Sequence, residues 1–550
     1  MSVDDHSPAI TRSSGALLHR WSVLAALTLI LGFAAFVRIR LIDLPLERDE
    51  GEYAYAGQLM LQGIPPYQLA YNMKLPGTYA AYAAVMAVFG ESTRGIHLGL
   101  ILVNSITSVL LYFLGRRLFG PICGVVAAAC FALLSLSYSV LGLAAHATHF
   151  VTIFGIAGSL LLLRAIEKRN AWLCFWSGFL FGLAFLMKQQ GVFFGVFGGI
   201  VLLRQELIRR PREVRRLWLR TASFSTGMLL PFALTCIAVA AAGVFSRFWF
   251  WTFSYARQYA ATTPLAHGWL NLTSRFWMIF LSMPTLYLLA GLGLLLLCWQ
   301  RKDRDKSFCA IALLLASFAT TCPGLYFRHH YFIPVLPALA ICAGAAIHIL
   351  HHDIRRRDGQ TMALIIPIGL FVFATGDAVY RHRVPFFEAG ADEAARKIYL
   401  DNPFPEAREI ARYIREHSGP ASRIAVLGSE PEIYFYSQRH SATGYIYTYP
   451  LLEPHPYALN MQQEMIAEIE ANKPEFVVFV NVPSSWLPRP NSSSFIFDWF
   501  EKYADTNLHR VGLVDIFTDQ PSVYRWEEKA VAVTPRSSSF VEIFKRNDLF

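Results

Sequence analysis

Long apolar segments separated by short polar ones determine the fold class of this sequence. About eleven segments are apolar over lengths near the 17 to 25 residues that a helix needs to cross roughly 30 Å of hydrocarbon. They lie near residues 21–42, 97–115, 121–141, 148–165, 171–187, 190–204, 221–242, 276–298, 308–323, 331–350 and 361–380. Two neighbouring pairs are separated so little that the count stays open by one or two. The sequence predicts a polytopic α-helical membrane protein with a tail at 1–20.

The composition supports this fold class and excludes others. Hydrophobic residues make up 54% of the chain and charged residues 16%, with a mean hydropathy of +0.37, which is too apolar for a soluble protein. The formal charge of +10 could suggest nucleic acid as a partner. The basic residues, however, come in short clusters between apolar segments, as in cytoplasmic membrane loops. We therefore expect membrane lipids and no nucleic acid as partners.

The basic clusters also predict the orientation in the membrane. Each follows an even-numbered span: Arg116–Arg117, Arg164–Arg169, Arg204–Arg220, Arg301–Lys306 and Arg355–Arg357. Positive charge gathers on the cytoplasmic side, so we expect the N-terminus in the cytoplasm and the protein in the inner membrane. The first span resembles the core of a signal peptide but has no small-residue cleavage site, so we expect it to be retained. The first outer loop is then 43–96.

The C-terminal region, 381–550, has the pattern of a separate domain. Short apolar runs at 423–428 and 474–481 predict buried strands, and apolar residues at helical spacing predict amphipathic helices at 405–417 and 458–472. A segment of this length can bury a core of its own. The odd number of preceding spans places this α/β domain outside the cytoplasm.

The first outer loop holds the candidates for chemistry. Arg48, Asp49, Glu50, Glu52 and Lys74 lie there between two apolar segments, and charges beside a membrane are costly to desolvate. The segments EGEYAYAGQLMLQG and GTYAAYAAVMAVFG predict two helices lying along the membrane surface. A simpler interpretation is that the acids cap the first helix and the lysine is a solvated surface cation.

Three motifs resemble those of the GT-C membrane glycosyltransferases. They are RDEGEYAYAG at 48–57, NMKLPG at 72–77 and GLYFRHHYFIPVLPAL at 324–339. The sequence is most similar to the branch that holds the protein O-mannosyltransferases, the aminoarabinose transferases of lipid A and the bacterial glycosyltransferases of family 39 or 83. The resemblance implies a GT-C-like catalytic domain over 21–380.

The resemblance also implies a reaction. Members of this family move a sugar from a polyprenyl-phosphate donor to an acceptor at the outer face of the membrane. Carried over by motif, Asp49 is the base for the acceptor hydroxyl, with Glu50 as partner or alternative, and Lys74 holds the lipid phosphate. A carboxylate suits the first role because an alcohol is a weak nucleophile until its proton leaves. We expect inversion at the sugar and an envelope glycan, lipid or protein as acceptor.

Further candidates for donor-phosphate contact lie at the outer ends of other spans. Arg328, with Tyr326 and Tyr331, belongs to a basic and aromatic loop late in the bundle, and Lys188 ends the fifth span. Cationic donors would stabilise the departing phosphate. The alternatives are an aromatic belt with an interfacial arginine, and a lysine that only anchors its helix.

A metal requirement is left open by the sequence. His146 and His149 are three residues apart at the predicted start of an outer helix, which makes them weak candidates for a metal pair. Relatives differ in whether they use a divalent ion. The adjacent His329 and His330 cannot both face one point on a regular helix, so we do not expect them to share a metal.

Two other functions fit an outward-facing membrane protein. A polyprenyl-linked sugar flippase or transporter would place its ionisable residues near the middle of the membrane and often has internal repeats, and neither is clear here. A receptor anchored by its helices would leave the charged first loop unexplained. In the C-terminal domain, Tyr434, Tyr436 and Arg439 could contact a glycan, although we expect a lid or scaffold role for them.

Overall fold

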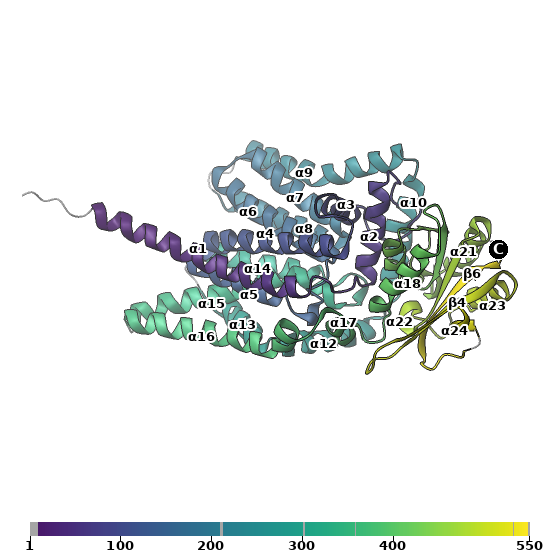
Figure 1. Ribbon diagram of the computed structural model, residues 1–550. Coiled ribbons are helices and arrows are strands. Elements are labelled where there is room, and N and C mark those ends of the chain that lie inside the picture. Colours follow the sequence, from purple (N-terminus) through teal and green to yellow (C-terminus); the bar gives the residue numbers. More distant parts are fainter. Residues whose placement is uncertain (1–8, 210–212, 301–302, 358, 532, 548–550) are drawn as a thin grey trace, which may run out of the picture.

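A helical bundle with a sheet domain at one end makes up the computed structural model (Figure 1). The structure describes residues 9–209, 213–300, 303–357, 359–531 and 533–547. Helix α1 runs along the bundle and projects beyond it, whereas α2, α3 and α10 lie at the opposite end, next to the sheet domain. The charged first loop is therefore placed where the two parts of the molecule meet.

Within the described residues, sixteen α-helices precede the sheet domain. They are α1 (Ala9–Arg40), α2 (Arg48–Leu61), α3 (Gly77–Phe89), α4 (Thr93–Phe119), α5 (Pro121–Leu134), α6 (Ala147–Lys168), α7 (Ala171–Met187), α8 (Val192–Ile208), α9 (Val214–Ala241), α10 (Phe245–Trp249), α11 (Ala256–Ala261), α12 (Leu265–Ser282), α13 (Pro284–Trp299), α14 (Arg304–Ala319), α15 (Leu336–Arg357) and α16 (Gln360–Arg381).

Each predicted span coincides with helical structure, but not all the helices are long enough to cross a membrane unaided. Seven helices of the described chain have the length and hydropathy of a span, or eight if one bent pair counts as one. The helix predicted over 121–141 is shorter, since α5 ends at Leu134. The chain is a multi-pass membrane protein, and the exact number of spans stays a prediction.

The span predicted over 276–298 is wrong as a single helix. It is divided between α12 and α13, which meet at an angle of 107°. Pro284 begins α13, and a proline there has no N–H to continue the hydrogen bonding of the preceding helix. Helices α12 and α13 therefore run in different directions.

Both helices predicted in the first outer loop are present. A capping box starts α2: the Glu47 carboxylate accepts from the backbone N–H of Glu50 at 3.0 Å, and the Glu50 carboxylate accepts from the backbone N–H of Glu47 at 3.3 Å. Beyond Pro65 and Pro66 the chain crosses to α3, which packs against α2. The capping box determines which residues occupy the first turn of α2.

The sheet domain confirms the predicted α/β pattern. Its six strands run in the order β2-β1-β3-β6-β4-β5. Strands β1 (Arg423–Leu427), β2 (His440–Ser441) and β3 (Phe476–Asn481) are parallel, and β4 (Leu508–Ile516), β5 (Val523–Trp526) and β6 (Ser539–Arg546) complete the sheet by antiparallel pairing. Its helices are α17 (Ala391–Tyr399), α18 (Phe404–Glu416), α19 (Glu432–Ser437), α20 (Tyr449–Leu452), α21 (Ala458–Asn472), α22 (Pro483–Trp486), α23 (Phe495–Asn507) and α24 (Glu528–Val531).

The sheet domain packs directly on α2 through α19. Tyr434 stacks on Tyr55 with ring centroids 5.2 Å apart, and the Tyr436 hydroxyl accepts from the backbone N–H of Leu46 at 2.9 Å. Arg439 donates to backbone carbonyls of its own domain, including Ser418. Of the three residues that the sequence offered as glycan contacts, Tyr434 and Tyr436 thus contact the bundle, whereas Arg439 is engaged within the sheet domain.

Candidate active site

Asp49 occupies the first turn of α2 because the capping box places the start of that helix at Arg48. Unpaired backbone N–H groups and the helix dipole favour a negative charge at this end. The Asp49 side chain is 14% exposed, enough to reach a cavity while being shielded from bulk water. A carboxylate in this position is both preorganised and accessible to a bound substrate.

Lys74 joins two carboxylates of α2. Its Nζ lies 2.7 Å from Asp49 Oδ1 and 2.8 Å from Glu52 Oε2. The other oxygen of Glu52 accepts from the Tyr79 hydroxyl at 2.6 Å, so this acid is fully engaged. The backbone carbonyl of Lys74 accepts from the Tyr67 hydroxyl at 2.7 Å, which fixes the loop that carries the lysine.

The opposite charges of this cluster offset the cost of removing each of them from water. Burial raises the cost of an ionised Asp49, but the Lys74 ammonium outweighs it and holds the pKa of Asp49 below its usual range. Burial likewise opposes the charge on Lys74, and the two carboxylates keep the pKa of Lys74 well above its usual value. Burial raises the pKa of Glu52. Asp49 is therefore an ionised carboxylate at neutral pH.

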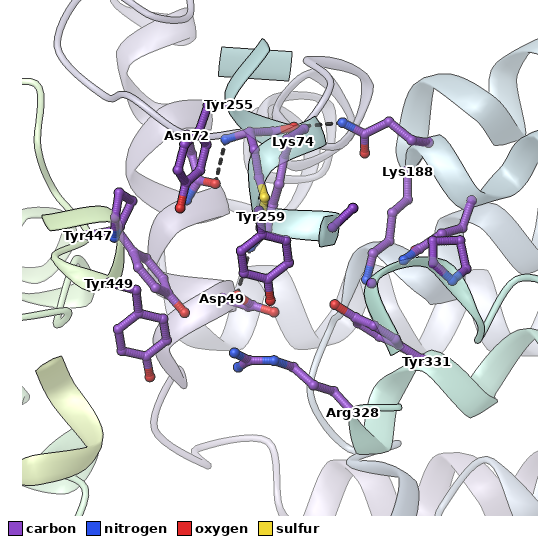
Figure 2. A pocket seen from close by; sticks show the side chains of 18 of the residues that line it. Asp49, Asn72, Lys74, Lys188, Tyr255, Tyr259, Arg328, Tyr331, Tyr447 and Tyr449 are labelled. Atoms are coloured by element: carbon purple, nitrogen blue, oxygen red, sulfur yellow. Dashed lines mark hydrogen bonds and ion pairs between the residues drawn. The ribbon is translucent and has the colours of Figure 1, made fainter. Parts of the chain in front are cut away.

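Asp49 and Lys74 line one cavity of about 190 Å³ (Figure 2). Three further residues predicted from the sequence, Lys188, Arg328 and Tyr331, line the same cavity. Figure 2 shows their side chains converging from several elements around Asp49. Residues that are far apart in the sequence thus form a single cationic and aromatic pocket around the Asp49 carboxylate.

Lys188 reaches this cavity from the turn between α7 and α8. Its Nζ lies 3.9 Å from the centroid of the Tyr331 ring, a cation–π contact. Burial lowers the pKa of Lys188 to about 7, and the Asp49 charge only partly opposes this. The neighbouring Gln189 donates to the carbonyl of Met73 at 2.6 Å and so connects this turn to the Lys74 loop.

Arg328 has aromatic rings as its neighbours. Its guanidinium carbon lies 5.6 Å from the Tyr326 ring centroid and 5.8 Å from that of Tyr449. The structure shows no ion pair of Arg328 with any described carboxylate. A half-buried guanidinium without an ion-pair partner among the described carboxylates is available for an anionic ligand.

Glu50, the sequence's alternative to Asp49 as base, points elsewhere. Its carboxylate accepts from the backbone N–H of Ala145 and lies 3.2 Å from His97 Nε2, in addition to its part in the capping box. Glu50 is fully buried and lines neither this cavity nor the larger one beside it. Its position suits holding α2 in place.

The structure groups His146 with Asp49 and His330, and not with His149 as the sequence suggested. His146 precedes α6 in non-helical conformation, so helical spacing to His149 does not apply to it. It stacks on His330 with ring centroids 4.1 Å apart, and the ligand atoms of Asp49, His146 and His330 all lie within 4.8 Å of one another. His329 turns away to the carbonyl of Ser139.

These three residues fit a divalent transition-metal ion. Two imidazoles and one carboxylate are a common donor set for such ions. Within the described chain, neither ring nitrogen of the buried His146 makes a hydrogen bond, which leaves both available for a metal. Burial lowers the pKa of His146 to about 4, so the ring is neutral, as a ligand must be.

A second cavity, of about 730 Å³, adjoins the first. Both are lined by Asp49, Arg328, His330, Tyr447, Tyr449 and Glu453. The second extends beneath the sheet domain toward α12 and contains Tyr326. Asp49 therefore lies where the two cavities meet.

Sequence reasoning missed the contribution of the sheet domain to these cavities. Tyr447 and Tyr449 follow a few residues after Tyr434, Tyr436 and Arg439, the residues of this domain that the sequence analysis considered. Tyrosines alternate in the segment YIYTYP, yet Tyr445 is buried in the domain core while the other two line the cavities. Only tertiary packing reveals this division.

Arg48, the residue that precedes Asp49, binds to the sheet domain. It donates to Glu430 Oε1 at 2.8 Å, to the Ser429 carbonyl at 2.6 Å and to the Tyr449 hydroxyl at 2.8 Å. The Arg48 and Glu430 side chains are 9% and 0% exposed. This buried network, called the Arg48 network below, couples the site to the domain above it.

The comparisons with known proteins agree with this architecture. The structure resembles that of ArnT from Cupriavidus metallidurans bound to undecaprenyl phosphate, with a TM-score of 0.57 and 15% identity over 94% of this chain and 97% of that chain. It also resembles the oligosaccharyltransferase AglB from Archaeoglobus fulgidus in complex with an inhibitory peptide and a dolichol-phosphate, with a TM-score of 0.53 and 13% identity over 93% and 75%. The chain has the GT-C fold.

One segment of the helical bundle also matches a known protein family in sequence. The family model of dolichyl-phosphate-mannose-protein mannosyltransferases matches residues 74–235. That segment includes Lys74, His146 and Lys188, three of the residues brought together beside Asp49. No curated protein matches this sequence. The GT-C resemblance read from the three sequence motifs is confirmed.

Proposed function

We propose that this chain is an integral-membrane glycosyltransferase that moves a sugar from a polyprenyl-phosphate donor to a hydroxyl group of an acceptor. The observation that carries the proposal is the convergence of Asp49, Lys74, Lys188 and Arg328 on one cavity. The cluster lies at one end of the bundle, under the sheet domain, where a lipid headgroup would meet its acceptor. A transporter would need its charges along a path through the membrane.

The chemistry assigns a role to each group. The acceptor oxygen loses its proton to Asp49 and forms a bond to the anomeric carbon, while the bond from that carbon to the phosphate oxygen breaks. The electron pair leaves with polyprenyl phosphate, whose charge Lys188, Arg328 and Lys74 stabilise. Attack from the face opposite the phosphate would invert the anomeric centre, and we propose that stereochemical course.

Engagement of Lys74 by the phosphate would also make Asp49 a better base. In the ligand-free ion pair, the ammonium favours the ionised form of the carboxylate and so weakens its affinity for a proton. A phosphate that shares the ammonium would raise the pKa of Asp49 toward its usual value. Donor binding would thereby prepare the acid for proton transfer.

A divalent ion held by Asp49, His146 and His330 is part of this proposal. When bound, such an ion supplies positive charge that helps the phosphate to depart.

We also propose that 21–380 forms the catalytic domain and 381–550 an extracytoplasmic domain. In this proposal the chain lies in the inner membrane and its N-terminus lies in the cytoplasm. The basic residues that end α4 and α6 support this orientation.

The proposal is tested by Asp49→Asn in purified protein given a labelled polyprenyl-phosphate sugar and candidate acceptors. Loss of a general base lowers turnover about 10²- to 10⁴-fold. Binding of undecaprenyl phosphate should persist, because Lys188 and Arg328 are intact. If the wild type forms no glycosylated product, the proposed function is wrong. Translocation of the lipid across vesicle membranes without sugar transfer would favour a flippase.

The matched control is Glu52→Gln. Glu52 shares Lys74 with Asp49 but lines neither cavity, so its loss disturbs the same ion cluster without removing the proposed base. We expect a much smaller reduction in turnover for this variant. Equal losses in the two variants would mean that the charge of the cluster matters and that Asp49 is not the base.

A further inference from the structure

A groove of about 710 Å³ lies between α4, α6 and α7, apart from the two cavities of the candidate active site. Three arginines line it: Arg116 and Arg117 in the last turn of α4, and Arg164 near the end of α6. All of its other lining residues are apolar, so no acid among the described residues lines it. It is called the Arg116 groove below.

The Arg116 groove lies at the end of the bundle away from the active site. Helix α4 begins at Thr93, at the end that carries α2, α3 and the sheet domain, and Arg116 follows 23 residues later. At about 1.5 Å per residue this is roughly 35 Å, enough to cross the hydrocarbon of a membrane. Helix α7 runs back across, from Ala171 to Met187, which precedes Lys188 of the active site. The groove therefore faces the other leaflet, the cytoplasmic one in the orientation proposed above.

Two of the three guanidinium groups have no acidic partner. Arg117 pairs with Glu167, and its Nε lies 2.9 Å from Glu167 Oε1. Arg116 and Arg164 are exposed and form no ion pair with any carboxylate of the described chain. Guanidinium groups gathered around one groove create a positive potential, and each can hold a phosphate through two parallel hydrogen bonds.

Toward the middle of the membrane the groove is apolar. Its apolar lining consists of Leu110 and Phe113 of α4, Ala157, Leu160 and Leu161 of α6, and Leu180 of α7. On both α4 and α6, the apolar residues and the arginines recur at spacings of three, four and seven, which places them on one face of each helix. Ala157 is seven residues from Arg164, about 10 Å along the helix. A cationic rim thus adjoins an apolar wall long enough for the first part of an acyl chain.

Tryptophans of α7 indicate that the arginines lie at the level of the lipid headgroups. Trp172, in the first turn of α7, is 63% exposed, and Trp176 is 39% exposed. They precede Leu180 at intervals of four residues, along the side of α7 that carries this groove residue. Exposed tryptophans at the end of a membrane helix are typical of the boundary between hydrocarbon and water. Phospholipid headgroups at that boundary would lie beside Arg116 and Arg164.

We propose that the Arg116 groove binds an anionic glycerophospholipid of the cytoplasmic leaflet. Arg116 and Arg164 hold its phosphate, and one acyl chain lies along the apolar wall that α4 and α6 form. The bound phosphate joins the ends of two helices whose unpaired positive charges repel each other without it. The choice of leaflet uses the orientation proposed above, but the site does not depend on the proposed reaction.

The test measures equilibrium binding of labelled phosphatidylglycerol, a lipid with one anionic phosphodiester, to the purified full chain in detergent. The double variant Arg116→Gln/Arg164→Gln should bind it at least about tenfold more weakly, because both charge-assisted contacts with the phosphate are lost. The matched control is Lys168→Gln/Arg169→Gln. It removes two positive charges from the same end of α6, at exposed positions that do not line the groove, and should bind the lipid like the wild type.

Ala157→Leu tests the apolar wall. The larger side chain would occupy part of the groove without changing its charge, and leucine suits a membrane helix. This variant should therefore also bind phosphatidylglycerol more weakly.

The wild type alone gives two further measurements. Phosphatidylcholine, which has no net charge, and glycerol 3-phosphate, which has no acyl chains, should bind much more weakly than phosphatidylglycerol. Added phosphatidylglycerol should raise the unfolding temperature of the wild type more than that of Arg116→Gln/Arg164→Gln, since a ligand that binds the folded state stabilises it.

Three results would overturn the assignment. Wild-type affinity in Arg116→Gln/Arg164→Gln, or an equal loss in Lys168→Gln/Arg169→Gln, would mean that the groove itself does not hold the phosphate. Equal binding of glycerol 3-phosphate would exclude a lipid site. Complete displacement of phosphatidylglycerol by an equal amount of undecaprenyl phosphate would assign the groove to the donor lipid instead. Each result is independent of the sugar-transfer assay with Asp49→Asn, so failure here leaves the proposed function untouched.

Discussion

Lys188 changes its charge near neutral pH. Its pKa of about 7 means that it is an ammonium below that pH and a neutral amine above it. A bound phosphate stabilises the ammonium, so affinity for undecaprenyl phosphate should fall about tenfold as pH rises from 6 to 9. Isothermal titration or a labelled-lipid binding assay across this range would measure the change.

Lys188→Arg separates this effect from the titration of the ligand. A guanidinium stays charged over the whole range, whereas the phosphate monoester gains charge near pH 6 in every variant. The ratio of wild-type to Lys188→Arg affinity should therefore decrease with pH. A constant ratio would mean that Lys188 does not contact the phosphate.

At the scale of elements, the position of α2 depends on close contact with α19. A Cβ added to Gly51 would lie 2.6 Å from the backbone nitrogen of Glu432, and backbone cannot move aside as a flexible side chain can. Gly51→Ala should therefore destabilise the protein by about 1 to 3 kcal/mol through overpacking and lower its activity. Gly32→Ala in α1 is the control, because nothing lies within 4 Å of that position. Similar thermal unfolding of both variants would contradict this account of the interface.

The elements also show what the sequence could and could not predict. Local patterns were sufficient for α2, α3, α21, β1 and β3, since each has its own periodicity or turn signals. The α12–α13 bend was missed because apolar residues continue across it, and only Pro284 marks the break. Motifs located Asp49 and Lys74, but the pairing of His146 with His330 depends on packing between α6 and a distant loop. No local pattern contains that information.

At the scale of the whole molecule, the Arg48 network makes the sheet domain part of the site. Arg48 is adjacent to Asp49 and reaches Glu430 and Tyr449, and the latter lines both cavities. Glu430→Gln should thus lower kcat/KM for transfer about ten- to a hundredfold by loosening the alignment of Asp49 with its substrates. The domain itself should stay folded, because glutamine has the size of glutamate and its carbonyl oxygen can still accept from the Ser485 hydroxyl.

The control for this prediction is Asp515→Asn, which breaks a buried ion pair of the same domain that is remote from the bundle. Asp515 pairs with Arg525 across β4 and β5, at the far end of the sheet from β1 and β2. This variant should lower the thermal stability of the domain while leaving kcat/KM near the wild-type value at temperatures where it is folded. If Asp515→Asn reduces kcat/KM as much as Glu430→Gln does, the domain acts through its stability alone. If only Glu430→Gln reduces it, the contact with Arg48 transmits the domain's position to the base.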